Sequence, residues 1–599
     1  MKKKIIVGIA IVIAAILLFK YFFKKTAEKE EYYTDYTGDI TVIQPDGEVP
    51  SRDFLAQNWS DEIREDFWFT SQGSDVMPYN WFTFLEQPDT TALFRNTDYL
   101  ESFGYLPEKS SLKNPSGLPI GFTITRYRNG IPRALGFNCA ACHTNQLNYN
   151  GKRYLIEGAP SVANFDRMNR HLVKALQQTL EDDQKFDRFA KNVLGEQGHS
   201  EENADGLRLQ LRNVYNTNKA RQLVNDVPAG YPTDFSGNGR VDAFGVIMNQ
   251  GTAFGLNDWG NKDYPTAPVS YPFLWGTHQS DVVQWNASAP NTPVVGPLAR
   301  NVGEVVGVFG NLEMVKSGSK IRYYSTVDYH GLGQLETWVK DLRSPQWSAD
   351  FPSIDANKAT MGEGLFKKEC MSCHQIISRE DEGMLYIANQ TPVSELGTDP
   401  LTADNIQNHK ARTLILEGTK QSVIAGAKFG PTARSIEIPV SGVVGLILQN
   451  PVNALEAGLA PLKSDGTEGA AKDIEEYLKE NAEKRKKQQE SGLVYKGRPL
   501  NGIWATAPYL HNGSVPNLWD LLQVPDKRTP NFQVGNRTFD PKNVGYILMD
   551  SINGKNPFIY RVFKEDGTIM PGNSNRGHLY GTQLTDEEKW ALIEYMKTL

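Results

Sequence analysis

The chain has 599 residues and a formal net charge of −7, because 63 Lys and Arg stand against 70 Asp and Glu. This balance excludes a protein that binds nucleic acid through a basic surface. A hydrophobic content of 40% and 11 Trp describe a folded protein with a large core, not a disordered or collagen-like chain. The four cysteines fall in two Cys-x-x-Cys pairs, which excludes a disulfide-stapled scaffold.

The first 25 residues have the pattern of a membrane-targeting segment. An apolar run extends from Ile5 to Phe19 between lysines, and counted through Phe23, with Lys20 snorkelling, it has 19 residues. That is near the roughly 20 residues that span a bilayer, and no Ala-x-Ala cleavage site follows it. We therefore expect residues 1–25 to be an uncleaved single-pass anchor in the inner membrane, with the body on the periplasmic or extracytoplasmic side. A cleaved signal peptide is the alternative.

The rest of the chain begins with a polar stretch over residues 26–55 that is rich in turn residues, so we expect a tether there. Helical periodicity predicts helices over Val162–Leu180, Leu335–Leu342, Lys472–Gln489 and Leu584–Leu599. The last of these opens with a possible capping box, Thr585 with Glu588. Long β alternation is scarce, and 52 Gly and 33 Pro predict long loops. The expected fold class is mainly α.

Two five-residue motifs carry the chemistry. They are Cys139-Ala-Ala-Cys142-His143 and Cys370-Met-Ser-Cys373-His374. Both match the Cys-x-x-Cys-His pattern of c-type haem attachment, in which two thiols one helical turn apart reach the two vinyl groups of a porphyrin and the adjacent His ligates the iron. A zinc site is disfavoured because both pairs carry His at the same place and lie far apart. A thioredoxin-like motif is disfavoured because no βαβ pattern surrounds either pair. Two covalently bound c-type haems are therefore expected.

The surroundings of the second motif favour a cytochrome fold. The segment Ala359–Cys370 resembles the first helix of a cytochrome c domain, in which a Gly and an aromatic, here Gly362 and Phe366, allow another helix to cross closely. The predicted helix at the end of the chain, Leu584–Leu599, is the expected partner. Helix, motif and terminal helix together predict a cytochrome c-type domain.

Several stretches resemble the di-haem cytochrome c proteins of the bacterial peroxidase superfamily, and within it the RoxA-like, or rubber oxygenase-like, branch. The segments that carry this resemblance are Ser71–Ser74, Tyr79–Trp81, Leu85–Gln87, Gly117–Phe122, the two haem motifs, Gly502–Gly513 and Asn573–His578. The resemblance implies an all-α fold of two haem domains with long loops, in which redox chemistry occurs at one haem and the other supports it. We place the N-terminal extension and first haem domain at residues 56–345 and the second at 346–599.

The sixth ligand of each haem iron is harder to identify from the sequence than the haem motifs are. His578 lies in a Gly-rich loop just before the terminal helix, where cytochrome domains place the distal ligand, and by resemblance to the RoxA-like branch it would coordinate the second haem. Met570 is the rival, since a thioether ligand would raise the potential of that haem. His511 is as well explained by a hydrogen-bonded histidine that braces a haem pocket. His171 could as well be solvated.

For the first haem no sixth ligand is found, and by resemblance its distal face is open to a dioxygen or peroxide species. The superfamily uses a Trp between the haems for electron transfer. Trp275 is the preferred candidate here, and Trp285 is the alternative. Peroxide cleavage would need a distal Glu, Gln or His as acid–base group. The sequence identifies no position for one, which favours dioxygen slightly.

The predicted function is a membrane-anchored di-haem oxidoreductase, peroxidase-like or dioxygenase-like, that activates dioxygen or peroxide at the haem of His143. The haem of His374 would serve as a six-coordinate electron reservoir. An electron-transfer protein with both irons closed is the alternative, and a zinc-stabilised binding module would require that haem be absent. The expected partners are the membrane, a small oxidant, and an electron donor or organic substrate whose identity the sequence does not reveal. No nucleic acid is expected.

Overall fold

A computed structural model describes residues 43–126, 133–292, 295–381, 384–463, 483, 492–548 and 558–599. These residues belong to one compact unit, Thr41–Leu599. The expected anchor at 1–25 and the predicted helix Lys472–Gln489 lie outside the described residues, apart from Glu483. Within the described ranges no single helix is long and apolar enough to cross a bilayer, and only α15 (Glu437–Gln449) and α16 (Pro451–Lys463), bent by 99° at their junction, pass that test as a pair.

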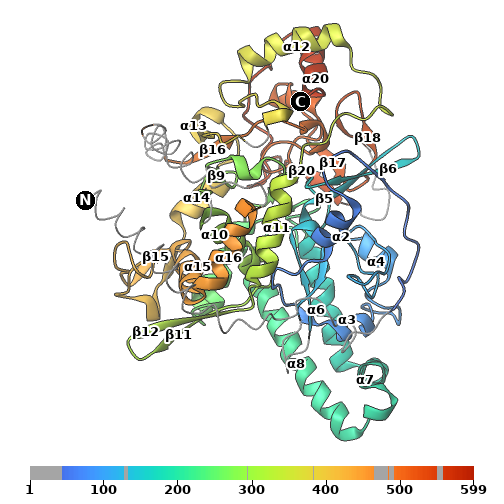
Figure 1. The fold of residues 1–599 in the computed structure, drawn as a ribbon, viewed down its shortest axis with the longest axis vertical. Helices are drawn as coiled ribbons and strands as arrows, with labels where there is room; N and C mark the ends of the chain where they lie inside the picture. Colours follow the sequence, from blue (N-terminus) through green and yellow to red (C-terminus); the bar gives the residue numbers. More distant parts are fainter. Residues whose placement is uncertain are drawn as a thin grey trace. The chain divides into compact units, whose positions relative to one another are not determined.

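Helices of up to 24 residues carry much of the fold (Figure 1). The α-helices other than α15 and α16 are α2 Asp61–Phe69, α3 Tyr79–Phe84, α4 Thr97–Glu101, α5 Cys139–Cys142, α6 Phe165–Glu181, α7 Asp183–Gly198, α8 Glu201–Val224, α9 Ala243–Asn249, α10 Val295–Gly307, α11 Tyr329–Asp341, α12 Ala356–Glu369, α13 Val393–Leu396, α14 Leu401–Asn408, α19 Leu518–Leu521 and α20 Asp586–Met596. Shorter turns are η1 Gln250–Phe254, which is a π-helix, and the 3-10 turns η2 Trp259–Asn261, η3 Thr277–Gln279, η4 Arg379–Asp381, η5 Leu414–Leu416, η6 Ile503–Ala505 and η7 Pro525–Lys527.

Short strands form small sheets between the helices, so the fold is mixed. The strands are β1 Asp53–Phe54, β2 Met77–Pro78, β3 Phe122–Ile124, β4 Ala134–Phe137, β5 Thr144–Tyr149, β6 Lys152–Glu157, β7 Arg240–Val241, β8 Val269–Ser270, β9 Val282–Val283, β10 Ala289–Pro290, β11 Leu312–Ser317, β12 Lys320–Ser325, β13 Asn389–Pro392, β14 Lys410–Arg412, β15 Thr432–Arg434, β16 Val494–Gly497, β17 Asn531–Val534, β18 Phe539–Asp540, β19 Gly545–Tyr546 and β20 Phe558–Arg561. Two sheets have three strands, in the orders β1-β6-β5 and β2-β4-β3, and the other sheets are pairs. Strands this short show too little alternation to be recognised from sequence.

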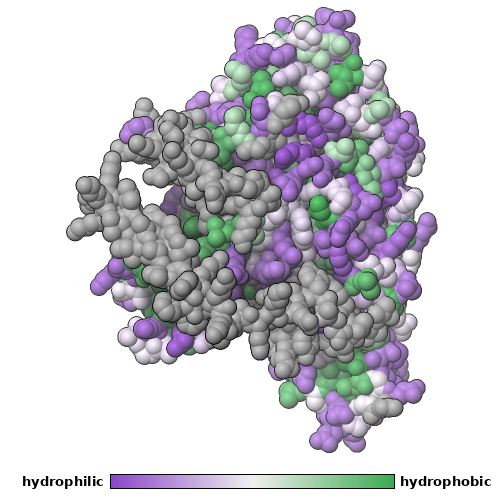
Figure 2. All heavy atoms as spheres, viewed as in Figure 1, coloured by the Kyte–Doolittle hydropathy of each residue, from purple (hydrophilic) through white to green (hydrophobic). Residues whose placement is uncertain are grey.

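The main hydrophobic core draws residues from both halves of the chain. Its buried members include Leu147, Trp275 and Val339 from the first predicted haem domain. Trp504 and Leu592 come from the second. On the face drawn in Figure 2, hydrophilic residues predominate and hydrophobic ones are scattered among them. Both predicted haem domains are therefore built around one shared core.

The predicted crossing of two helices beside the second motif is confirmed. Helices α12 and α20 lie side by side at the end of the molecule opposite α7 and α8 (Figure 1). A Cβ on Gly362 would lie 2.0 Å from the carbonyl oxygen of Ala591, so no larger residue fits without movement of the backbone. The ring of Phe366 packs on Tyr595 with centroids 5.3 Å apart. The predicted capping box of Thr585 and Glu588 begins α20.

We expect Gly362→Ala to lower the free energy of unfolding by about 1–3 kcal/mol, because the new methyl group overpacks a backbone contact. Gly364 is the matched control: it lies in the same helix, and a Cβ there meets no heavy atom within 4 Å. Gly364→Ala should be neutral or stabilise the protein by up to about 1 kcal/mol, since Ala favours helix over Gly. Urea denaturation of the two variants measures the difference, and equal midpoints would contradict the close crossing.

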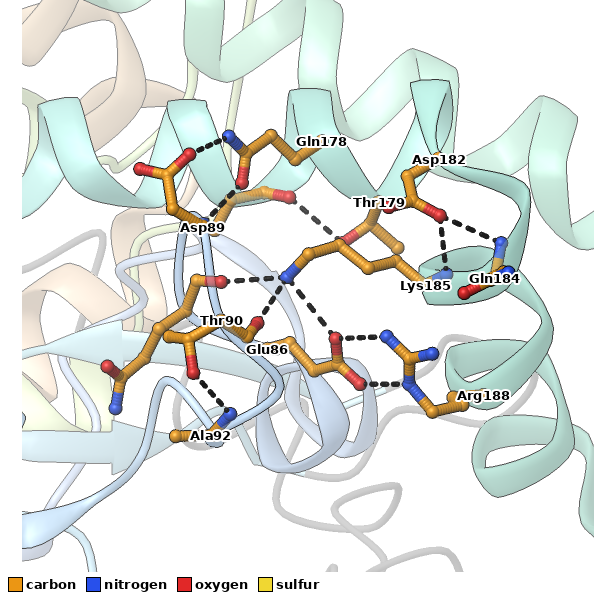
Figure 3. A network of polar contacts seen from close by, with 12 residues as sticks. Glu86, Asp89, Thr90, Ala92, Gln178, Thr179, Asp182, Gln184, Lys185 and Arg188 are labelled. Atoms are coloured by element: carbon orange, nitrogen blue, oxygen red, sulfur yellow. Dashed lines mark hydrogen bonds and ion pairs between the residues drawn. The ribbon is translucent and has the colours of Figure 1, made fainter.

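A polar network holds helices α6 and α7 to the loop that follows α3 (Figure 3). Asp182 ends α6 and also caps α7, where its carboxylate accepts the backbone N–H groups of Gln184 and Lys185 at 2.9 and 3.1 Å. Lys185 Nζ donates to the carbonyl oxygens of residues 87 and 90. Arg188 forms a two-pronged ion pair with Glu86 at 2.6 and 2.8 Å. These bonds give a structural role to Leu85–Gln87, one of the segments that carry the family resemblance.

Candidate haem sites

The first motif forms a single helical turn, α5, that two other segments hold in place. Asn138 caps this turn by accepting the N–H of Ala140 at 3.0 Å, and its Nδ2 donates to the carbonyl oxygen of Phe67 at 2.7 Å. Gly121 has a left-handed φ of 86°, and a Cβ on it would lie 2.1 Å from the backbone nitrogen of Ala141. This contact explains why the Gly117–Phe122 stretch needs glycine: its backbone lies directly on the turn that carries the two thiols.

His143, at the end of the turn, is buried and points one ring nitrogen at the backbone. Its Nδ1 lies 2.7 Å from the carbonyl oxygen of Pro272. Burial lowers the pKa of His143 to about 4, so the imidazole is neutral at physiological pH. A neutral imidazole whose Nδ1 is bound to a carbonyl leaves Nε2 free as a metal ligand, which is the usual arrangement of haem histidines.

A cavity of about 360 Å³ adjoins His143 and both thiols of the motif. Apolar side chains form most of its wall: Val241, Phe244, Ile247, Val269, Val283, Leu332, Leu335, Pro439, Val443 and Val444. Lys496 and Arg498 also line it, and neither forms an ion pair with a carboxylate of the described residues. Burial lowers the pKa of both, to about 10 for Arg498. A flat apolar group that bears carboxylates, such as a haem with its propionates, fits this donor set.

A cluster of polar side chains lies in the wall of the same cavity. Arg300 and Asn301 of α10 both bond to Glu336 of α11, the Asn301 amide at 2.9 Å. Glu304, one helical turn after Arg300, also lines the cavity, and its carboxyl has no hydrogen bond or ion pair within the described part of the chain. Burial raises the pKa of Glu304, and Arg300 opposes this rise. The cavity therefore contains an unpaired carboxyl beside a fixed ion pair.

The sequence prediction missed this cluster. No position for a distal Glu, Gln or His was identified from the sequence, because α10 and α11 lie between the two motifs and far from both along the chain. A signal does exist: Val295–Gly307 is an otherwise apolar helix in which Arg300, Asn301 and Glu304 fall within one turn. Charged residues so placed on an apolar helix point to a buried polar site.

The second motif follows α12 directly and lies against a two-stranded sheet. Cys370 ends α12, and strand β16 passes so close to the motif that a Cβ on Gly497 would lie 2.3 Å from the carbonyl oxygen of Cys373. On the paired strand β13, Thr391 Oγ1 lies 3.5 Å from Cys373 Sγ. The backbone of each motif is thus in close contact with a glycine from another segment. This glycine is Gly121 at the first motif and Gly497 at the second.

The two histidines predicted for the second haem face one another. The ring centroids of His374 and His578 are 6.4 Å apart, with the ring planes tilted by 53°. Two imidazole–metal bonds of about 2 Å each, added to the distance from each ring centre to its nitrogen, come to nearly this separation. His374 Nδ1 lies 2.7 Å from the carbonyl oxygen of Arg498. The pair therefore fits an iron between two imidazoles.

The loop that carries His578 is held in a strained shape. His578 has a left-handed φ of 48°, which is uncommon for a residue other than glycine. The buried guanidinium of Arg528 donates to the carbonyl oxygens of Gly577 and His578 at 2.9 and 3.1 Å. Burial, with further contributions from His374 and Arg528, lowers the pKa of His578 to about 3. The loop thus presents a neutral imidazole in a fixed orientation.

The rival ligands have other partners. Met570 is buried, and its sulfur accepts a hydrogen bond from Asn573 Nδ2 at 3.5 Å. His511 stacks on Tyr495 with centroids 4.2 Å apart. His171 is hydrogen-bonded to a tyrosine, Tyr99, at 2.8 Å. The structure pairs only His578 of these candidates with the ring of a motif histidine.

Both candidate tryptophans lie beside the first site. Trp275 is buried, stacks on Phe273 with centroids 4.8 Å apart, and donates its indole N–H to the carbonyl oxygen of Asn501 at 2.7 Å. Trp285 lines the cavity and donates to the carbonyl oxygen of Ser270 at 3.0 Å. Trp275 is the better connected of the two, because its carbonyl oxygen also accepts a hydrogen bond from Arg498 at 3.1 Å.

The two motifs differ in their exposure to solvent. Ala140 and Ala141 of the first motif are buried, whereas Met371 of the second is 43% exposed. Leu579, next to His578, is 54% exposed. No group of three or more His, Cys, Asp or Glu side chains suited to a metal ion is found in the part of the chain that the structure describes. The first motif is therefore more deeply buried than the second, which lies near the surface.

Comparison with known proteins agrees with part of this interpretation. Residues 494–533, which include Arg498 and the Gly502–Gly513 run, match a family described as RoxA-like, cytochrome c-like. An uncharacterised protein of Sinorhizobium fredii, y4iJ, is 31% identical over 604 residues, which cover 91% of this chain and 93% of that protein. A second uncharacterised protein of that organism, y4iM, is 24% identical over 364 residues, or 58% of this chain and 69% of its own length.

Proposed function

We propose that this chain, which belongs to the family of the Sinorhizobium fredii protein y4iJ, is a di-haem c-type oxidoreductase. The proposal rests on its RoxA-like, cytochrome c-like segment and on the geometry of the two histidine sites. Its RoxA-like, cytochrome c-like segment implies covalently bound haem and a role in oxidation–reduction or electron transfer. The proposal goes further in three respects: there are two haems, their roles differ, and the haem of His143 reacts with dioxygen or peroxide. The single observation that carries it is the largely apolar cavity that both His143 and the unpaired carboxyl of Glu304 line.

Each haem has its own holding residues in this proposal. Cys139 and Cys142 would carry the first haem, with His143 as its axial ligand. The second haem would be held by the corresponding residues, namely Cys370, Cys373 and His374, together with His578. When bound, haem iron supplies a site at which dioxygen or peroxide is reduced if one axial position is open, or an electron store if both are filled.

The residues around the first site would serve the reaction in three ways. The largely apolar wall would lower the local dielectric constant, which strengthens charge interactions inside the cavity. The ion pair of Arg300 with Glu336 keeps the guanidinium fixed, so that it can orient a bound anion or oxygen species. Burial raises the pKa of Glu304 and so favours its protonated form, from which a proton would pass to an oxygen atom within the cavity.

The second site is suited to receive electrons. His374 and His578 would both ligate a haem bound there, and the motif lies near the surface where a donor protein can approach. The carbonyl oxygen of Trp275 accepts a hydrogen bond from Arg498, whose own carbonyl oxygen lies 2.7 Å from His374 Nδ1, and this supports the proposed role of Trp275 in electron transfer.

The haem count tests the proposal directly. The purified protein should contain two covalent haems per chain, and Cys370→Ala with Cys373→Ala should reduce this to one, because the Cys139 pair is untouched. A pyridine haemochrome assay measures the count. A single haem in the unaltered protein would refute the di-haem assignment, and two low-spin haems in the resting protein would instead identify an electron carrier.

A further inference from the structure

Arg498 has unusual surroundings for a charged residue. It is 8% exposed, and within the described ranges no carboxylate pairs with it. Its guanidinium stacks on the ring of Phe273, with the central carbon 3.6 Å from the ring centroid. Leaving a buried charge without a counter-ion costs several kcal/mol unless other groups satisfy it. An ion pair therefore does not explain why the charged side chain of Arg498 is buried here.

One side of Arg498 is bound to the segment that orients His143. Nη1 donates to the carbonyl oxygen of Phe273 at 2.8 Å, and Nη2 to that of Trp275 at 3.1 Å. Pro272, the residue before Phe273, provides the carbonyl oxygen that lies 2.7 Å from His143 Nδ1. The guanidinium thus fixes the short segment from which the first axial histidine takes its orientation.

The other side of the same residue orients His374. The backbone carbonyl oxygen of Arg498 lies 2.7 Å from His374 Nδ1. The preceding residue, Gly497, lies against Cys373 of the second motif. One residue therefore contacts the second axial histidine through its main chain and the support of the first through its side chain, although the two histidines are 231 positions apart in the sequence.

We propose that Arg498 is a positioning residue that couples the two haem sites, as a hydrogen-bonded bridge between their axial histidines. The inference rests on the proposed function, since it requires both haems. The bridge runs from His143 through the Pro272–Trp275 backbone and the guanidinium of Arg498 to His374. A transfer along it moves one electron from the second haem, which is oxidised, to the first, which is reduced, and needs no proton or further reductant.

The chemistry of arginine suits this role and that of lysine does not. A planar guanidinium presents two N–H donors at once to the carbonyl oxygens of Phe273 and Trp275, and its flat face stacks on the Phe273 ring. A lysine ammonium keeps the charge but is a point donor on a flexible stem. Arg498→Lys therefore keeps the positive charge near both haems. It removes the pair of hydrogen bonds to the carbonyl oxygens of Phe273 and Trp275.

The experiment measures coupling in the holoprotein. One electron is delivered to the second haem by laser-flash photoreduction, and the absorption of the first haem records the arrival of that electron. Mutation of a group that orients a metal ligand typically lowers metal affinity or activity by about 10–100-fold. We therefore expect Arg498→Lys to slow the electron transfer by at least about tenfold. The absorption spectra of both oxidised haems should match those of the unaltered protein. A substitution that disrupted the haem sites would change these spectra.

Arg322→Lys is the matched control, because it makes the same change at an exposed position on β12 that does not line the cavity. It should preserve transfer within about twofold. Transfer in Arg498→Lys at the unaltered rate would overturn the inference. If that variant loses a haem, Arg498→Gln decides: its single amide group cannot bond to the carbonyl oxygens of Phe273 and Trp275 as the guanidinium does, and unchanged transfer there would also overturn the inference. A protein with fewer than two haems would refute the proposed function instead.

Discussion

His578→Ala converts the second haem from low spin to high spin, according to the geometry of the second site. The substitution removes one of the two imidazoles whose rings lie 6.4 Å apart and leaves His374 and its carbonyl partner untouched. The first haem should keep its spectrum, because His578 does not line the cavity beside His143. Electron paramagnetic resonance of the oxidised protein measures both signals separately. Turnover should also fall, since the loss of a strong axial donor changes the potential of the electron store.

Met570→Ala is the matched test of the rival ligand. The Met570 sulfur accepts a hydrogen bond from Asn573, so its removal should leave the low-spin signal in place. The opposite pattern, in which Met570→Ala abolishes that signal and His578→Ala does not, would make the histidine assignment wrong. The second domain would then be closer to an ordinary His/Met cytochrome, and the interpretation as an electron carrier would gain.

Glu304→Gln is expected to lower the rate with peroxide or dioxygen by about 10²–10⁴-fold, the usual contribution of a positioned acid–base group. The amide keeps the size of the side chain but has no proton to give. In the unaltered protein, activity should fall as pH rises through the raised pKa of Glu304, because the carboxyl then loses its proton. This arm of the pH profile should be missing in the variant, as steady-state rates across the pH range will reveal.

Glu313→Gln provides the control for charge. It neutralises an exposed carboxylate on β11 and should leave the rate unchanged within about twofold. The haem content of Glu304→Gln has to match that of the unaltered protein for the comparison to hold. An equal rate in the two variants, with full haem content, would show that Glu304 takes no part in proton transfer.

Features of this protein that depend on residues close together in the chain can be predicted from the sequence. The two motifs, the capping box before α20 and the glycine crossing at Gly362 each have a local pattern, and the structure confirms the last two. The His374–His578 pairing came from a family resemblance, and the close approach of the two rings agrees with it.

Other features depend on contacts between distant segments and have no local pattern. Glu304 and Glu336 come from different helices, and only the packing of α10 beside α11 brings them to one cavity. Lys496 lies in a short strand and Arg498 directly follows it, and nothing near them in the sequence shows that both line the same cavity as Cys142. Small sheets such as β13 with β16 also depend on pairing across about a hundred residues.

Strand β16 brings a late part of the chain to a cavity that an early part begins. Lys496 of β16, and Arg498 directly after that strand, line the same cavity as Cys139 and Cys142. This wall is therefore complete only after most of the chain has been synthesised. If haem is attached to Cys139 and Cys142 as proposed, attachment during synthesis would precede the completion of the wall.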